Sequence, residues 1–371
     1  MRKPLHILLI GMMVVSLSAC TQTDKPNIQG KEEIQDTLKG ITPDFVLGTD
    51  DEPDGSFGKA YTEDGYYSFQ FVDDLEKNLS GQLLTYTEYG SSQSLFVCGK
   101  AGCNHENPEC NAYFDRNTYP PVTPNYIWYY DGNLYVFCVK KDYYEIEKVA
   151  KDGSSRSKSC NLFRTSIETE TDDEGAVSTG ISYPKVVLHR GYVYFSIGDE
   201  TSEECCLYRV KLDSTKEAEK LYIQDGKYPA LYRLKGYGNY ILFQMGNYLD
   251  KSLNGVDMDI CAWDIKDEKV VEVVEGVARD YTVGTDCIYY FDLNQSGGIM
   301  KYDLKTKETT AIGDIKEDVA FDTVFLFERD GKLYASTENS QLVFDQSGTQ
   351  IYVREGNEMI YPYVPSLKED E

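Results

Sequence analysis

The sequence is poor in basic residues and in histidine, and each shortage excludes a class of function. Its 371 residues include 37 Lys and Arg against 62 Asp and Glu, so the formal net charge is −25. Binding to a phosphate backbone requires a basic surface, and nucleic acid is therefore not expected as a partner. Only three histidines occur, which argues against a lyase that holds its metal ion with several imidazoles.

Motifs that would mark a catalytic centre are also missing. The sequence contains no Gly-x-Ser-x-Gly nucleophile elbow and no repeated Ser-x-Asp-x-Gly-x-Thr-Trp box of the sialidase kind. His189 precedes Arg190 and Gly191 at an expected turn, where a solvated or capping imidazole is the common case. We therefore expect no catalytic residues.

The first twenty residues are typical of a targeting segment. Arg2 and Lys3 precede an apolar stretch at residues 7–17, which is too short for a permanent membrane span. Residues 17–20 read Leu-Ser-Ala-Cys and resemble the lipobox of bacterial lipoproteins, in which the cysteine becomes the lipid-modified N-terminus. The resemblance implies a signal peptide at residues 1–19 and lipidation of Cys20. An ordinary secretory signal is the alternative.

A polar linker is expected after the lipidated cysteine. Residues 21–54 hold a single aromatic side chain, Phe45, and cannot bury much surface. We place the linker at residues 20–60, with a brief helix around residues 31–39, and the folded domain at residues 61–371.

The folded part is expected to be all-β. Hydrophobic residues make up 41% of the chain, enough for a core, and its 31 tyrosines favour strands over helices. A Gly-containing turn followed by alternating aromatic and aliphatic residues recurs six times, at residues 64–69, 131–137, 190–195, 238–243, 285–291 and 330–335. A second alternating run follows each, at residues 83–86, 144–149, 207–210, 260–264, 299–303 and 342–345. Such alternation next to Asp-Gly turns indicates antiparallel hairpins.

Six small sheets at regular spacing predict a six-bladed β-propeller. The repeat length of about 50 residues lies in the range of propeller blades, and ring closure removes exposed sheet edges. The segment 359–364 is one further strand, which we expect to complete the first blade. The alternative is a seven-bladed ring with a degenerate blade in residues 111–183.

These repeats, together with the lipobox and the acidic linker, resemble the TolB-like six-bladed propellers of cell-surface lipoproteins from Gram-positive, clostridial-type bacteria. The resemblance covers essentially the whole chain and rests on the number and order of the repeats. It implies a fold and a location at the outer face of the membrane. It implies no activity, because this group has no agreed one.

A compact cluster of cysteine and histidine is the most distinctive motif. Cys98, Cys103, His105 and Cys110 form a C-x4-C-x-H-x4-C pattern, and a similar cluster is seen in the resembling lipoproteins. Three thiolates and one imidazole suit a structural zinc site, although the spacing is not the usual C-x2-C knuckle. A disulfide such as Cys98 with Cys110 and plain reduced thiols are equally open alternatives. In all three cases the cluster would fix a loop.

The other cysteines are expected to be structural. Cys205 and Cys206 should point to opposite faces of a strand rather than form a vicinal disulfide. Four more, at 138, 160, 261 and 287, are expected to be small buried hydrophobes.

Three further features of the sequence concern ligand binding. The acidic loop at residues 250–259 lacks the register of a Ca²⁺ loop, and residues 168–174 are expected to be a solvated insertion. Aromatic side chains could stack on a sugar or peptide, although packing between blades is the more common role. The aromatic residues concerned are Trp128, Tyr129, Tyr130, Tyr143, Tyr144, Tyr237, Tyr248 and Trp263.

The sequence thus predicts a lipid-anchored, monomeric propeller that binds a ligand, such as a glycan, or a protein partner and catalyses no reaction. One alternative is an extracellular enzyme acting on glycans, with two carboxylates meeting in the propeller channel. Another is a scaffold or assembly component of a surface complex. No cofactor is predicted apart from the zinc considered for the Cys/His cluster.

Overall fold

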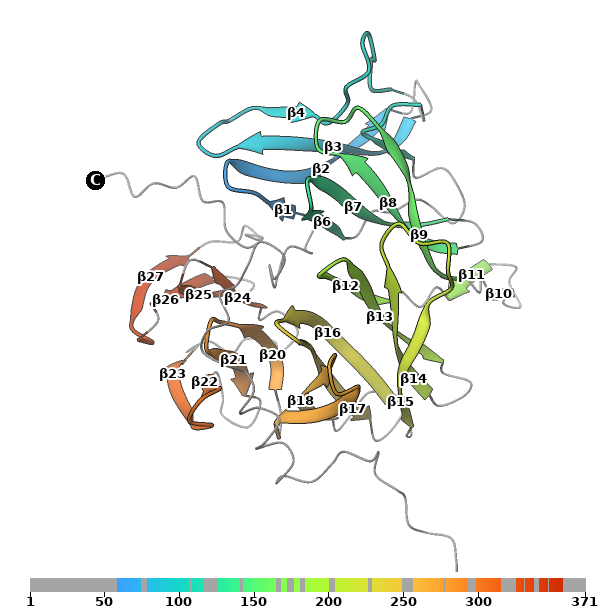
Figure 1. The fold of residues 1–371 in the computed structure, drawn as a ribbon. Coiled ribbons are helices and arrows are strands. Elements are labelled where there is room, and N and C mark those ends of the chain that lie inside the picture. The colour runs from blue at the N-terminus through green and yellow to red at the C-terminus, as the bar shows by residue number, and fades with distance from the viewer. Residues whose placement is uncertain are drawn as a thin grey trace, which may run out of the picture.

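A computed structural model shows that the fold is a ring of small antiparallel sheets (Figure 1). The structure describes residues 59–74, 79–106, 109–115, 126–140, 143–164, 168–171, 177–180, 184–199, 204–225, 229–248, 256–275, 278–292, 298–314, 325–329, 331–336, 340–345 and 347–355. The predicted signal peptide, Cys20 and the linker up to residue 58 lie outside these residues, as does the predicted closing strand at 359–364.

Blades 1 to 3 follow one another along the chain. Blade 1 contains β1 (Lys59–Tyr61), β2 (Gly65–Asp74), β3 (Leu79–Glu88), β4 (Ser94–Phe96) and β5 (Tyr113–Asp115). Blade 2 contains β6 (Ile127–Tyr130), β7 (Asn133–Val139), β8 (Tyr143–Ala150) and β9 (Arg156–Arg164). Blade 3 contains β12 (Lys185–His189), β13 (Tyr192–Asp199), β14 (Glu204–Lys211) and β15 (Glu219–Asp225).

Blades 4 to 6 have the same plan of four consecutive antiparallel strands. Blade 4 contains β16 (Pro229–Tyr237), β17 (Tyr240–Tyr248), β18 (Val256–Asp264) and β19 (Lys269–Val274). Blade 5 contains β20 (Ala278–Val283), β21 (Cys287–Asp292), β22 (Gly298–Asp303) and β23 (Thr309–Asp314). Blade 6 contains β24 (Phe325–Arg329), β25 (Lys332–Ser336), β26 (Ser340–Phe344) and β27 (Gln350–Glu355).

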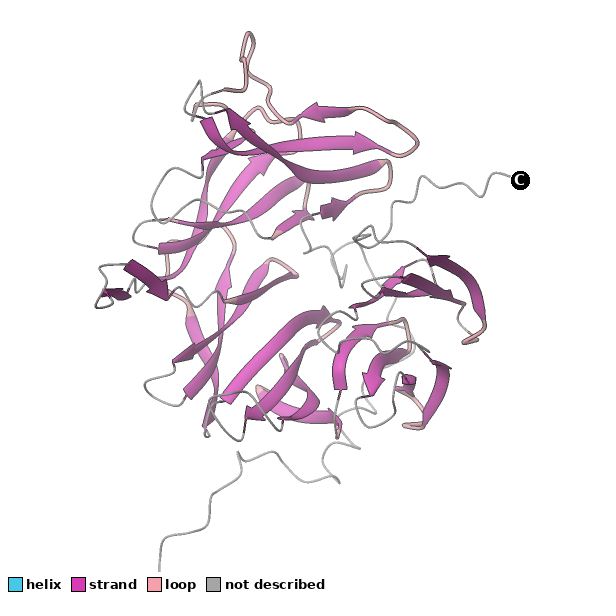
Figure 2. Ribbon diagram, turned by 180° about the vertical axis from the view of Figure 1, so that it is seen from behind, coloured by secondary structure: helices cyan, strands magenta, loops and turns pink. Residues whose placement is uncertain are grey.

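The protein is therefore an all-β, six-bladed β-propeller, as predicted. In Figure 1 the first strand of each blade lies toward the centre of the ring and the last strand toward its rim. The view from behind shows the same ring, and the described residues are strands and loops only (Figure 2). Within them, no helix has the length and apolar character to cross a membrane.

The seven-bladed alternative is wrong. The described residues within 111–183 hold β5 of blade 1, blade 2, which the six predicted repeats already include, and one extra hairpin. That hairpin pairs β10 (Glu168–Thr171) with β11 (Val177–Gly180) and forms a separate two-stranded sheet. Residues 168–174 were expected to be a solvated insertion, and their first four residues form strand β10.

Turn chemistry explains how the first and second strands of blades 2 and 3 are joined. Asp131 and Gly132, between β6 and β7, have φ values of 45° and 72°. Arg190 and Gly191, between β12 and β13, have φ values of 48° and 77°. Two successive left-handed residues are the mark of the type I′ turn, whose twist matches that of the flanking strands.

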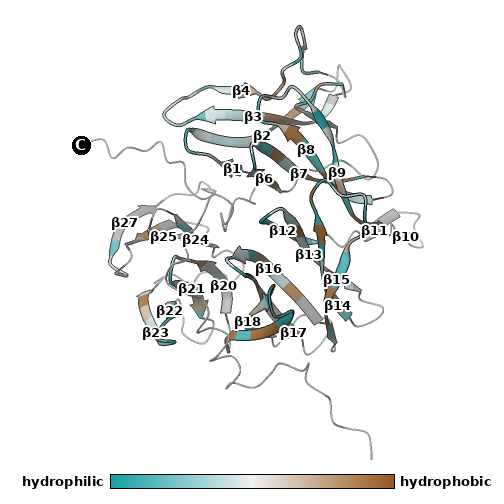
Figure 3. Ribbon diagram, viewed as in Figure 1, coloured by the Kyte–Doolittle hydropathy of each residue, from teal (hydrophilic) through white to brown (hydrophobic). Residues whose placement is uncertain are grey.

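The core lies between neighbouring blades rather than in one central mass. Blades 2 and 3 share a buried cluster that includes Phe137, Ile146 and Phe195, and blades 3 and 4 share one that includes Tyr194 and Phe243. Figure 3 shows hydrophobic segments on strands such as β8, β16 and β17. Burying each such large side chain contributes about 1.5–3 kcal/mol, so every blade depends on its neighbours.

Candidate functional site

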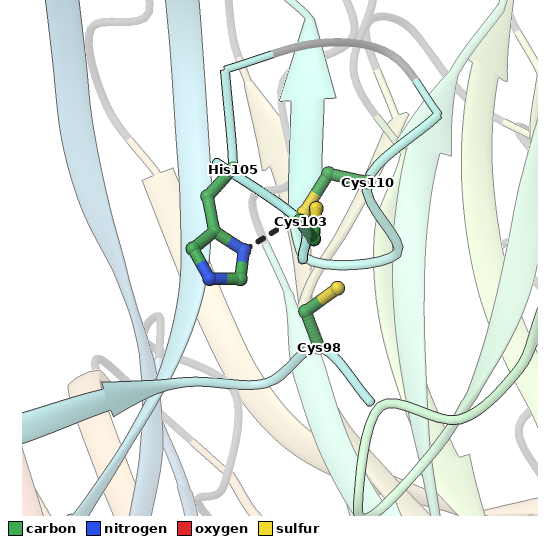
Figure 4. Close-up of side chains that lie close together, drawn as sticks. All are labelled: Cys98, Cys103, His105 and Cys110. Atoms are coloured by element: carbon green, nitrogen blue, oxygen red, sulfur yellow. Dashed lines mark hydrogen bonds between the residues drawn. The ribbon is translucent and has the colours of Figure 1, made fainter. Parts of the chain in front are cut away.

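The Cys/His cluster lies on a loop that leaves the outer strand of blade 1. This segment, residues 97–112, connects β4 to β5 and is named here the Cys/His loop. Figure 4 shows Cys98, Cys103, His105 and Cys110 turned toward one another. The ligand atoms of the four side chains all lie within 4.8 Å of one another. The structure thus brings together the four residues that the sequence singled out.

Local backbone geometry turns the imidazole toward the thiols. His105 adopts a left-handed φ of 60°, and Gly102 one of 71°. The Nδ1 atom of His105 lies 3.3 Å from the Sγ atom of Cys110. On its other side the His105 ring packs against the ring of Phe96 on β4, with a centroid distance of 4.9 Å. A non-glycine residue adopts positive φ only when its surroundings hold it there.

The thiols experience two opposing electrostatic effects. Burial of Cys98 opposes its ionisation, but backbone N–H groups of Lys100 and Asn111 donate hydrogen bonds to it and lower its pKa on balance. Burial raises the pKa of Cys110 to about 12, despite a hydrogen bond from the backbone N–H of Ala112. N–H groups placed around sulfur in this way stabilise thiolate charge.

The donor set has the composition of a closed metal site. Three sulfurs and one imidazole nitrogen match the four ligands of a structural zinc centre, in which no position remains open for a substrate. The structure records the cysteines of its described residues as free thiols, at positions 98, 103, 110, 138, 160, 205, 206, 261 and 287.

A second group of side chains gathers on the innermost strands and was not found from the sequence. Lys185 on β12 lies with its Nζ atom 6.0 Å from the ring centre of Tyr232 on β16. Burial lowers the pKa of Lys185, and the positive charge of Arg233 lowers it further. Burial also raises the pKa of Tyr126, just before β6, with Arg233 acting in the opposite direction. Lys185, Arg233, Tyr126 and Tyr232 are named here the inner cationic group.

The inner cationic group joins three blades. Lys185 and Arg233 lie on the first strands of blades 3 and 4, and Tyr126 directly precedes the first strand of blade 2. Arg233 forms an ion pair of 3.0 Å with Asp280 on β20 of blade 5. The only sequence signal for this group is the presence of charged residues in the segments before the Gly turns.

His189 does not have the solvated position expected for it. Its side chain is 1% exposed, and Nε2 lies 2.7 Å from the carbonyl oxygen of Gly238 in blade 4. The reason is its place at the end of β12, an inner strand that β16 of the next blade covers. A Cβ atom on Gly236 of β16 would lie 2.2 Å from the Nδ1 atom of His189, so the contact depends on glycine there.

Four of the eight aromatics considered for stacking on a ligand are core residues. Trp128, Tyr144, Tyr237 and Trp263 are each at most 5% exposed, so packing is their role. Tyr129, Tyr130 and Tyr143 are partly exposed, while Tyr248 closes β17 and its side chain lies outside the described residues.

The remaining cysteines are buried, as expected. Cys205 and Cys206 are successive residues of β14, and those at 138, 160, 261 and 287 lie on strands. Burial raises the pKa of five of these thiols, at 138, 160, 205, 261 and 287. The centre of the acidic loop at residues 249–255 lies outside the described residues.

Comparison with known proteins gives likenesses of shape only. No family model and no curated protein sequence matches the chain. The β-propeller domain of the Trilobed protease from Pyrococcus furiosus is 10% identical, with a TM-score of 0.46, over 81% of this chain and 82% of that one. TolB from Acinetobacter baumannii is 11% identical, with a TM-score of 0.40, over 78% of this chain and 65% of that one.

A third neighbour comes from a study of two prolyl endopeptidases. It is 11% identical, with a TM-score of 0.49, and the match covers 87% of this chain but 45% of that one. This chain therefore spans less than half of that enzyme's length. At such identities and TM-scores, the neighbours indicate nothing about what this chain binds or catalyses.

Proposed function

We propose that this protein is a membrane-anchored, extracytoplasmic propeller that binds a small anionic ligand at the centre of its ring and catalyses no reaction. The observation that carries the proposal is the inner cationic group. The Nζ atom of Lys185 on β12 lies 6.0 Å from the ring centre of Tyr232, and Arg233 is the next residue of β16, in a chain whose net charge is −25. Two neighbouring cations in a partly buried place favour binding of an anion.

The chemistry of the group suits a sugar acid or a similar carboxylate. The ligand would share Arg233 with Asp280, which pairs with the Nη1 atom of Arg233 at 3.0 Å, and Lys185 would supply a point charge for its carboxylate. The ring of Tyr232 supplies a surface of the kind that stacks on sugars, whereas the ring of Tyr126 stacks on Trp128 with a centroid distance of 5.7 Å. Because the ligand would pair with cations held on inner strands, a neutral sugar should bind much more weakly.

Three buried acid–base side chains, those of His189, Asp280 and Glu147, have structural roles, which supports the proposed absence of catalysis. His189 is buried against a backbone carbonyl, as described above. The Oδ1 atom of Asp280 accepts hydrogen bonds from the backbone N–H of Tyr281 and pairs with Arg233, and its Oδ2 atom accepts the N–H of Leu326. Glu147 is similarly engaged, because it pairs with Arg156 at 2.5 Å and with Lys140 at 2.8 Å.

Binding can be tested with defined anions on the purified full chain. We expect glucuronate to raise the thermal unfolding midpoint, since a ligand at a hundred times its dissociation constant stabilises the folded state by about 2.7 kcal/mol. Inorganic phosphate and neutral glucose serve as comparison probes. Lys185→Gln should weaken glucuronate binding about tenfold, which corresponds to about 1.4 kcal/mol.

The matched control is Lys216→Gln, which removes an exposed lysine in the turn after β14 and should leave binding unchanged. If none of the anions shifts the midpoint, or if both variants bind equally well, the ligand proposal is wrong. Product analysis after long incubation with glucuronate-containing oligosaccharides checks the absence of catalysis, since any cleavage would contradict it.

Membrane anchoring is the second part of the proposal and rests on Cys20. Cys20→Ser removes the thiol that would carry the lipid, so we expect the protein to move from the membrane fraction to the soluble fraction of expressing bacteria. Cys287→Ser, at a buried thiol of β21, is the control and should stay with the membrane. Equal distribution of both variants would overturn lipid anchoring through Cys20.

A further inference from the structure

The Cys/His loop is an insertion within a single strand. β4 pairs with residues 85–87 of β3, and β5 continues in the same direction opposite residues 81–83. Leu84, between these two sets, accepts a hydrogen bond from the N–H of Val97 and donates one to the carbonyl of Ala112. The chain therefore leaves the fourth strand of blade 1 and returns to it at the same residue of β3.

The ligand atoms lie close to the spacing that a tetrahedral ion requires. Zn–S bonds of about 2.3 Å and Zn–N bonds of about 2.0 Å place neighbouring ligand atoms about 3.5–3.8 Å apart. The four ligand atoms lie within 4.8 Å of one another, and the Nδ1 atom of His105 is 3.3 Å from the Sγ atom of Cys110. Small side-chain rotations are enough to reach tetrahedral coordination.

A metal ion accounts for the whole cluster, and a disulfide does not. A disulfide between Cys98 and Cys110 would leave Cys103 and the left-handed His105 without a role. A metal ion employs all four side chains, and their soft sulfur character selects zinc over calcium or magnesium.

The loop is also fixed to the neighbouring blade beside its ligands. The N–H of Gly99 and the side-chain amide of Asn111 both donate to the carbonyl of Gly153, at 2.9 Å and 2.8 Å. Gly153 lies in the turn between β8 and β9 of blade 2. Gly99 and Asn111 each adjoin a ligand cysteine, so an ion that fixes these cysteines also fixes the contact between blades.

We propose that Cys98, Cys103, His105 and Cys110 bind one Zn²⁺ in a closed tetrahedral site that clasps the Cys/His loop to blade 2. The ion has no open coordination position and its role is structural. This inference is independent of the anionic ligand, because the inner cationic group lies on the innermost strands and the zinc site at the rim.

Elemental analysis of the full chain, purified without a histidine tag and under reducing conditions, tests the site. We expect about one zinc per chain, and Co²⁺ exchanged into the protein should give the thiolate-to-metal absorption of a tetrahedral site. Cys103→Ser should lower zinc affinity more than about 100-fold, beyond the effect of losing an outer-sphere partner. Cys287→Ala, which also removes one buried thiol, should keep its zinc.

A measurement on the unaltered protein covers the case in which Cys103→Ser fails to fold. Chelation should lower the thermal midpoint and speed hydrogen exchange of the Cys/His loop and the 150–155 turn, with reversal when Zn²⁺ returns. The proposal is overturned if the reduced protein neither contains nor takes up zinc, if it holds iron or copper in its place, or if Cys103→Ser retains full occupancy.

Discussion

At the scale of single residues, Arg156 of blade 2 holds β5, the strand that directly follows the Cys/His loop. Arg156 on β9 donates from Nη1 to the carbonyl of Tyr113 on β5 at 2.5 Å. Its guanidinium also lies 3.8 Å from the ring centre of Phe114. Burial opposes ionisation of its partner Glu147, but the charge of Arg156 lowers the pKa of that carboxyl on balance. The ion pair with Arg156 therefore keeps the buried Glu147 carboxyl charged.

The sequence predicted the four ligand candidates but not the residues that support them. The ligands lie within one short segment, so their spacing was visible as a pattern. Gly153 and Arg156 belong to another blade, and no local periodicity connects them to Cys98. Neither the metal nor the disulfide could be preferred from spacing alone, since the choice depends on where His105 lies relative to the three sulfurs.

Substitution of Gly153 tests the contact between the blades. Gly153 has a φ of 70°, and a Cβ atom there would lie 2.3 Å from the backbone carbon of Val97. Gly132 has a φ of 72° with nothing within 4 Å of its Cβ position, so Gly132→Ala is the matched control. Gly132→Ala should lower the free energy of unfolding by about 1–2 kcal/mol, because a left-handed conformation is unfavourable for alanine.

Gly153→Ala should lower the free energy of unfolding by about 1–3 kcal/mol more than Gly132→Ala does, because backbone atoms must move to admit the methyl group. Urea unfolding measures both losses. The Gly153 variant should also bind zinc more weakly, because its carbonyl anchors Gly99 and Asn111. Equal losses in the two variants, with unchanged zinc affinity, would show that the turn does not hold the loop.

At the scale of strands, alternation identified the middle of each blade and missed its borders. The six predicted pairs of runs fall on the second and third strands, such as β13 and β14. Inner strands such as β12 are buried along nearly their whole length and show no alternation, while outer strands such as β23 are polar. The split of one outer strand into β4 and β5 depends on pairing with β3, which no sequence pattern reveals.

Asp280 is the residue through which three inner strands are joined. It lies on β20, pairs with Arg233 of β16 and accepts the N–H of Leu326 on β24. Its side chain is 2% exposed. Asp280→Ala would remove this carboxylate from the Arg233 guanidinium and from the N–H of Leu326. We expect the free energy of unfolding to fall by about 3–5 kcal/mol. Chemical denaturation measures the loss, and hydrogen exchange should rise first in β24.

Asp286→Ala is a suitable control for Asp280→Ala. Asp286 pairs with Lys305 at 2.8 Å, but its side chain is 40% exposed, so the pair should contribute at most about 1 kcal/mol. If the two variants lose the same stability, the buried carboxylate does not join the inner strands in the way described.

At the scale of the whole molecule, the number and spacing of repeats were enough to predict six blades. Blade number follows from counting hairpins, because each must cover its hydrophobic faces with two neighbours. The inner cationic group could not be predicted, since it depends on residues from three blades meeting at the ring centre. The predictions for Cys20 and for the strand at 359–364 concern segments outside the described residues and stay predictions.

X-ray absorption spectroscopy at the zinc edge of the purified full chain tests the central claim, that one ion is held by three sulfurs and one imidazole. We expect three sulfur scatterers at about 2.3 Å and one nitrogen at about 2.0–2.1 Å, with no water bound. Two or fewer sulfurs, or a shell containing solvent oxygen, would contradict a closed site formed by Cys98, Cys103, His105 and Cys110.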